Sequence, residues 1–168
     1  MGNVKPTKKL EILKKSLVKK EKLFEEKLQC HFETVAQANG QPLNDKRNGR
    51  ATIKKWDRQN DSLHNLKESI KKTENAIERE EGRIYAGDAC YATMPKIMTD
   101  MIDNGTLTQW RRHPNTMFVK GVDKARIIWD EKKQTIFYKY AANIPDQTQF
   151  AIFKQVFNDL HAGISQKR

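Results

Sequence analysis

The chain of 168 residues has few cysteines and no long apolar run. Cys30 and Cys90 are too few and too far apart in sequence for a disulfide framework or a zinc ribbon, which agrees with a reducing compartment. With 37% hydrophobic residues and a mean hydropathy of -0.85, no window supplies the roughly 18 to 20 apolar residues that a membrane span requires. We therefore expect a soluble protein with free thiols.

The first residues also lack the features of a targeting signal. Residues 1–10 carry lysines, but no apolar segment follows them, so we expect no secretory signal. Pro6 occupies the position at which N-myristoylation requires serine or threonine. Together with the cysteine content, this predicts a cytoplasmic location.

Positive charge is the strongest feature of the composition. The chain has 32 Lys plus Arg against 21 Asp plus Glu, which gives a net charge of +11 and a pI near 9.6. Such a surplus is typical of proteins that bind a polyanion, because each neutralised phosphate releases counterions. A solvated helix face is an equally good interpretation of the lysines in residues 8–22.

Residues 1–86 have the pattern of two long helices. Apolar residues recur along one stripe of a helical wheel, which predicts a first helix over residues 8–38. Asn39 and Gly40 favour a left-handed stop, and residues 41–50 are expected to form a loop.

The second helix, expected over residues 51–85, has apolar residues at intervals of seven. Its repeat consists of Trp56, Leu63, Ile70, Ile77 and Ile84. A strict repeat of seven predicts left-handed supercoiling against a partner helix.

Charge predicts that these two helices are antiparallel. The basic residues in 8–22 then lie beside the acidic residues in 74–81, and the acidic residues in 25–33 lie beside the basic residues in 54–58. A short connection can close such a hairpin but cannot return the chain for a parallel pair. We therefore expect a long antiparallel, coiled-coil-like helical hairpin.

Residues 87–168 have the composition of a small mixed module. Thr93, as N-cap before Met94 and Pro95, predicts a short helix that ends at Asn104-Gly105. β-branched and aromatic residues predict a three-stranded antiparallel meander over 117–122, 125–129 and 134–140.

A last helix is expected to begin at a capping box of Asp146 and Gln149 and to end at Gly163. The fold class is thus predicted as α+β. A helical hairpin over residues 1–86 precedes a module over residues 87–168, in which helices flank the three-stranded sheet.

Two basic patches are candidate nucleic-acid contacts. The first is the hairpin tip, where cations gather on and beside the predicted loop: Lys46, Arg47, Arg50, Lys54, Lys55 and Arg58. The second follows Gln109, where arginines adjoin an aromatic residue: Trp110, Arg111 and Arg112, with Lys120, Lys124, Arg126 and Lys139 as possible extensions. Arginines can clamp a phosphate while an indole stacks on a base. Trp110 as an anchor of the core is the alternative interpretation.

The strand over 134–140 offers a further surface. Ile136, Tyr138 and Tyr140 alternate with Phe137 and Lys139, so one face of the strand is expected to meet the last helix. The face with Phe137 and Lys139 is left for a ligand, the hairpin or another subunit.

A helix-turn-helix pattern and a nuclease-like fragment give weaker predictions. A helix-turn-helix is conceivable with residues 107–113 as its reader helix, but Pro114 cuts that helix short. Glu131 and Lys133, with Asp123 upstream, match a fragment of metal-dependent nucleases.

Isolated residues add no catalytic or metal site. Cys30, His31 and Cys90 lack an evident fourth zinc ligand. The four histidines, His31, His64, His113 and His161, stand alone, without a partner acid or nucleophile at a recurring spacing.

The sequence therefore predicts a non-enzymatic accessory or regulatory protein that binds nucleic acid, with DNA as the expected partner, through the phosphate backbone. No cofactor, metal or membrane contact is expected, and the hairpin sets spacing or pairs two copies as a homodimer. The alternative is a protein-interaction module whose hairpin docks onto a helical partner or its own copy, with the basic surface recognising an acidic protein. A plasmid or phage origin is compatible with this build.

Overall fold

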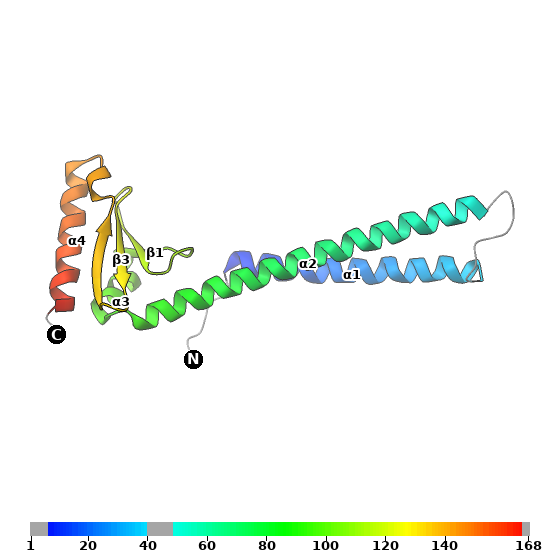
Figure 1. The fold of residues 1–168 in the computed structure, drawn as a ribbon, viewed down its shortest axis with the longest axis horizontal. Coiled ribbons are helices and arrows are strands. Elements are labelled where there is room, and N and C mark those ends of the chain that lie inside the picture. The colour runs from blue at the N-terminus through cyan, green and yellow to red at the C-terminus, as the bar shows by residue number, and fades with distance from the viewer. Residues whose placement is uncertain (1–6, 40–48, 166–168) are drawn as a thin grey trace. The chain divides into compact units, whose positions relative to one another are not determined.

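The computed structural model describes residues 7–39 and 49–165. The chain divides into two compact units, a hairpin unit of Lys5–Glu81 and a sheet unit formed mainly by Gly82–Arg168. Its elements, drawn in Figure 1, are α1 (Lys8–Gln37), α2 (Gly49–Thr93), α3 (Lys96–Asp103), β1 (Leu107–Gln109), β2 (Thr116–Val119), β3 (Arg126–Asp130), β4 (Thr135–Lys139), the 3₁₀ helix η1 (Ala141–Asn143) and α4 (Gln147–Ser165). No helix within the described ranges is both long and apolar enough to cross a membrane.

Helix α1 has the predicted length and identifiable ends. The side chain of Thr7 accepts a hydrogen bond from the Leu10 N–H, which caps the first turn. Asn39 follows the helix with a φ of 53°, the left-handed conformation expected of a helix stop. Gly40, the second residue of the predicted stop, lies outside the described residues.

Hydrogen bonds between α1 and α2 confirm the antiparallel hairpin (Figure 1). Lys20 Nζ donates to Thr73 Oγ1 at 2.7 Å, and Lys27 Nζ donates to Ser62 Oγ at 2.6 Å. Residue numbers rise along α1 as they fall along α2. Because these four side chains are polar, the contact between the helices depends on hydrogen bonds as well as on apolar packing.

Helix α2 is longer than the sequence predicted. It begins at Gly49, inside the expected loop, and continues to Thr93, past the expected end at residue 85. Gly82 and Gly87 do not stop it, because a helical glycine costs only about 1 kcal/mol relative to alanine. Thr93 therefore ends α2, and Pro95 takes the predicted place of Thr93 as the N-cap of α3.

The seven-residue repeat of α2 is only partly buried. Leu63 is buried, whereas Trp56, Ile70, Ile77 and Ile84 keep partial exposure. The Nε1 atom of Trp56 is buried and has no hydrogen-bond partner in the structure. A two-helix hairpin thus covers part of the apolar stripe and leaves the rest accessible.

The sheet has four antiparallel strands in the order β1-β2-β3-β4, one more than predicted. The additional strand is β1, which pairs Leu107 with Val119 and Gln109 with Met117. This segment was the reader helix of the helix-turn-helix alternative, which the structure contradicts. The pairing with β2 outweighs the helical pattern of so short a segment.

One face of the sheet forms the core of the sheet unit. Ile127 and Trp129 of β3 point to this face and pair with Tyr138 and Ile136 of β4. Met98 of α3 and Phe153 of α4 are buried in the same cluster. Since successive residues of a strand alternate, Arg126 and Phe137 must point to the other face.

Helix α4 differs at both ends from the prediction. The Gln149 N–H donates to Asp146 Oδ2 at 3.2 Å, but the Gln149 side chain accepts from the Asp123 N–H, so only half of the capping box forms. Gly163 does not end the helix, which runs to Ser165. A Cβ at position 163 would collide with Ile97 of α3, so the glycine permits close packing of the two helices.

The buried carboxylate of Glu80 provides a test of the hairpin unit. Its side chain is 1% exposed, and it accepts a hydrogen bond from Thr7 Oγ1 at 3.1 Å and lies 3.3 Å from Lys9 Nζ. We predict that Glu80→Ala lowers the free energy of unfolding by about 2 kcal/mol, because the substitution removes buried charge-assisted hydrogen bonds. Urea unfolding followed by far-UV circular dichroism measures the change.

The neighbouring Glu81 supplies the matched control. It pairs with Lys14 at 2.7 Å, but both side chains are at least half exposed. An exposed ion pair contributes about 0 to 1 kcal/mol, so Glu81→Ala should have the smaller effect. Equal effects of the two substitutions would contradict the role assigned to Glu80.

Candidate nucleic-acid interface

The hairpin tip retains part of the predicted basic patch within the described residues. Arg50, Lys54 and Arg58 lie in the first turns of α2 and are exposed. Lys46 and Arg47, the two predicted contacts in the connecting segment, lie outside the described residues. The described part of this candidate interface therefore consists of the start of α2 and the facing part of α1.

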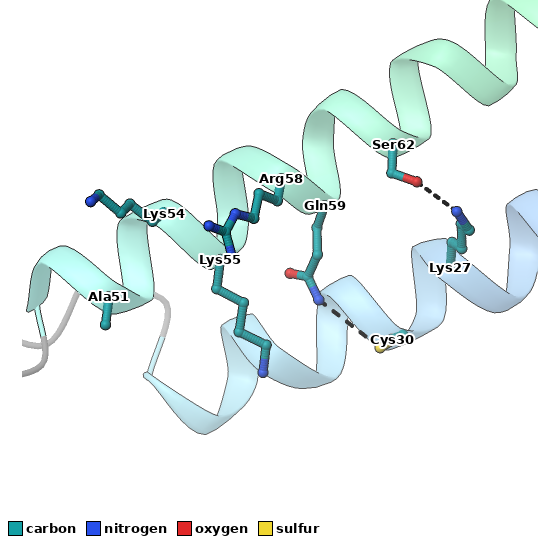
Figure 2. Close-up of a pocket in the computed structure, with 8 residues that line it drawn as sticks. All are labelled: Lys27, Cys30, Ala51, Lys54, Lys55, Arg58, Gln59 and Ser62. Carbon is teal, nitrogen blue, oxygen red and sulfur yellow. Dashed lines mark hydrogen bonds between the residues drawn. The ribbon is translucent and has the colours of Figure 1, made fainter.

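A pocket of about 470 Å³ lies between α1 and α2 beside these cations. Its lining consists of Lys27, Cys30, Ala51, Lys54, Lys55, Arg58, Gln59 and Ser62, none of which is acidic. Figure 2 shows Lys27 and Cys30 of α1 facing Ser62 and Gln59 of α2, where the Lys27 Nζ–Ser62 Oγ bond of 2.6 Å joins the two helices. Its volume is in the range of small-ligand sites.

The cations of this pocket are not neutralised by neighbouring acids. Among the described residues, Lys54, Lys55 and Arg58 form no salt bridge. The first turn of α2 also lacks an acidic residue, so the positive end of the helix dipole adds to the same potential. The ion pairs between the helices lie at the other end of the hairpin, at Glu80 and Glu81.

In the sheet unit, Trp110 is not a core residue. It follows β1 and donates its backbone N–H to Thr116 O, which continues the pairing with β2. Its ring lies 5.6 Å from that of Phe118, on the face of the sheet opposite the core. The tryptophan of the core is Trp129, which is 2% exposed.

Arg126 joins three aromatic rings on this second face. Its guanidinium carbon lies 4.7 Å from the Trp110 ring centre, 5.2 Å from that of Tyr140 and 5.6 Å from that of Phe118. Distances below about 6 Å allow a cation–π attraction. We call these four residues the Arg126 cluster. The sequence suggested Arg126 only as an extension of a basic patch, because the cluster forms across four separate segments.

Tyr140 reaches Arg126 through an unusual backbone conformation. The sequence placed Tyr140 on the same face as Ile136 and Tyr138, toward the last helix. Tyr138 does pack there, edge-on to Phe157 of α4 at 5.1 Å. Tyr140 instead has a φ of 63° at the end of β4, so the alternation stops and its ring lies over Arg126. A left-handed tyrosine is strained, and contact with the guanidinium offsets part of that cost.

The other predicted residues of this patch lie at both ends of β2. Arg111 and Arg112 lie in the turn before it, and Lys120 and Lys124 lie in the turn after it. All four side chains are exposed. These four residues therefore form two groups, one at each end of β2. The Arg126 cluster lies on the strands between the two groups.

The nuclease-like fragment is not brought together. Asp123 precedes β3, whereas Glu131 and Lys133 follow it, so the strand separates the acids. The Asp123 carboxylate instead accepts a bond from Gln149 at 3.4 Å. Within the described ranges, no three side chains of the metal-ligating types lie close enough to hold an ion.

Two groups of the sheet unit have shifted pKa values. Burial raises the pKa of the Cys90 thiol, Glu131 raises it further, and a hydrogen bond with Gln109 lowers it in part. A hydrogen bond to Asp103 raises the pKa of Tyr91. Both groups therefore stay protonated at neutral pH, and Cys90 lacks the lowered pKa of a nucleophilic thiol.

Comparisons of the chain with protein-family models, with curated proteins and with solved structures gave no match.

Proposed function

We propose that the protein is a cytoplasmic, non-enzymatic accessory or regulatory factor that binds nucleic acid through its phosphates. The observation that carries the proposal is the pocket at the hairpin tip, whose four cations have no acidic residue among their lining neighbours. A phosphate backbone is the polyanion that lysines and arginines without acidic neighbours bind most commonly. The net charge of +11 would speed the encounter with that partner.

The arrangement of charge in the hairpin also supports this proposal. Near the start of α1, Lys9 and Lys14 pair with Glu80 and Glu81. Cations at the tip do not, although Asp57 and Asp61 lie on the same helix. If the charged residues served only to stabilise the hairpin, we would expect ion pairs between α1 and α2 at both of its ends.

A protein-interaction module is the second candidate. Ile12 and Val18 of α1 are more than half exposed, and Ile70 and Ile77 of α2 are only half-buried. A second hairpin could cover this apolar surface in a four-helix assembly, which would also double the number of basic tips.

The salt dependence of binding tests the first candidate. We predict that the Lys54→Ala, Lys55→Ala, Arg58→Ala variant binds duplex or single-stranded nucleic acid more weakly. Its slope of log affinity against log salt should be smaller by about 0.9 for a duplex, or about 0.7 for a single strand, for each phosphate that the variant no longer neutralises. Fluorescence anisotropy with labelled oligonucleotides at several salt concentrations measures both quantities.

A control variant removes the same charge elsewhere. Lys8, Lys15 and Lys19 are exposed on α1, so their replacement by alanine lowers the net charge equally and leaves the pocket intact. This variant should keep most of the affinity. Equal decreases of affinity in both variants would show that net charge alone, and not the pocket, determines binding. If the native protein bound no nucleic acid at low salt, the proposal would be refuted.

The oligomeric state tests the second candidate. If the half-buried stripe of α2 is an interface, light scattering should give the mass of a dimer that dissociates on dilution. Ile70→Ser with Ile77→Ser should shift the equilibrium toward monomer, because less apolar surface is buried. A monomeric mass at every concentration would contradict the candidate.

A further inference from the structure

The face of the sheet opposite the core carries a distinct set of side chains. By the register of the strands, this open face presents Thr108, Trp110, Thr116, Phe118, Arg126, Ile128, Asp130, Thr135, Phe137 and Lys139. The core residues of α3 and α4 cluster with the opposite face. An antiparallel sheet requires only one covered face. On the second face Thr116 and Ile128 are buried, whereas Phe137 and Lys139 of β4 are exposed, so the accessible part of this face lies along β4.

Aromatic rings on this open face are unusually accessible. Phe137 is 40% exposed, and Tyr140, which joins the face through its left-handed backbone, is 52% exposed. Trp110 and Phe118, which contact Arg126 together with Tyr140, are half-buried. Exposed rings on a sheet are suitable platforms for nucleobases, since every base has a π-face that can stack.

The charge of the open face fits a phosphate chain. Arg126 forms no ion pair with a carboxylate of the described residues, and its buried Nε has no hydrogen-bond partner. Lys139 lies directly opposite Arg126 on β4 and is exposed. The one acid among the strand positions of this face is Asp130, at the other end of β3.

That acid is engaged within its own turn. Asp130 Oδ1 accepts the backbone N–H groups of Lys132 and Lys133, each at 3.1 Å. The Asp130 carboxylate therefore stabilises the turn between β3 and β4. The end of the face around Arg126 and Lys139 stays positive. Tyr140, Arg126 and Lys139 thus lie at one end of this face, whereas Phe137 lies opposite Ile128 in the middle of β3 and lines a hollow with Asp130 and Glu131.

We propose that the open face binds single-stranded nucleic acid, with bases stacked on Tyr140 and Phe137 and with phosphates near Arg126 and Lys139. This inference rests on the proposed function and adds its substrate class. A duplex keeps its bases stacked inside and offers their faces only at its ends, so it cannot use exposed rings in this way. The Arg126 cluster fixes the Tyr140 ring before binding, which reduces the entropic cost of forming the complex.

Binding of a labelled dT oligonucleotide of about 12 nucleotides, a length within the range of single-strand sites, tests the inference against a duplex of equal length. The variants Tyr140→Leu and Phe137→Leu keep an apolar side chain and the net charge but remove a ring. Each should lower the single-strand affinity roughly tenfold and change the duplex affinity by less than about twofold.

Tyr85 supplies the control, because it is 78% exposed and belongs to α2 rather than to a strand of the sheet. Tyr85→Leu should leave single-strand affinity unchanged, and circular dichroism checks that each variant is folded. Because Phe137 has ordinary strand geometry, its variant remains informative if Tyr140→Leu misfolds.

The outcomes separate the inference from the proposed function. Duplex binding without single-strand binding, or single-strand affinity unchanged in both ring variants, would overturn the inference and leave the proposed function in place. An absence of binding to both probes at low salt would overturn both. Preferential binding of the single strand that depends on Tyr140 and Phe137 would support both.

Discussion

The burial of one face of a four-stranded antiparallel sheet is the constraint on which the sheet unit depends. Ile127, Trp129 and Ile136 must meet the apolar sides of α3 and α4, because these helices supply buried partners such as Met98 and Phe153. Once that face is fixed, strand alternation assigns every other residue to the opposite face. The positions of Arg126, Phe137 and Lys139 are therefore consequences of the core.

The hairpin unit is stabilised by other interactions than the apolar core of the sheet unit. Its helices meet through hydrogen bonds such as Lys20–Thr73 and through the buried carboxylate of Glu80, with Leu63 as a buried apolar contact on α2. The polar pairs fix the register of the two helices, since each buried donor must find its acceptor. They also engage Lys20 and Lys27, whereas Lys54, Lys55 and Arg58 at the tip form no salt bridge with the described residues. Net charge alone could not distinguish the two ends.

Much of the fold could be predicted from the sequence where a signal was long and periodic. The stripe of α1, the basic residues in 8–22 opposite the acidic residues in 74–81, and the alternation of β4 gave the antiparallel hairpin and the orientation of Phe137. The predicted pairing of the acidic residues in 25–33 with the basic residues in 54–58 forms no ion pair among the described residues. Short or weakly marked elements could not be predicted. The strand β1 has three residues and is defined by its pairing with β2, and α2 continues through Gly87 because no signal there is strong enough to stop it.

The candidate site was harder to predict than the fold, because it depends on contacts between distant residues. In the sequence Arg111 and Arg112 directly follow Trp110, but the cation that packs on the Trp110 ring is Arg126, sixteen positions later. The left-handed φ of Tyr140 has no signature in the sequence, since tyrosine at the end of a strand normally continues the alternation. These contacts form only when four strands are in register.

A titration of the isotope-labelled full chain with a dT oligonucleotide, followed by nuclear magnetic resonance, is the most direct test of the central claim that the open face is the interface. We expect shifts of the Arg126 Nε–H and Trp110 indole signals and of the Phe137 and Tyr140 amides, with the buried Trp129 indole unchanged. A titration in which these signals stay fixed while other residues shift would contradict it.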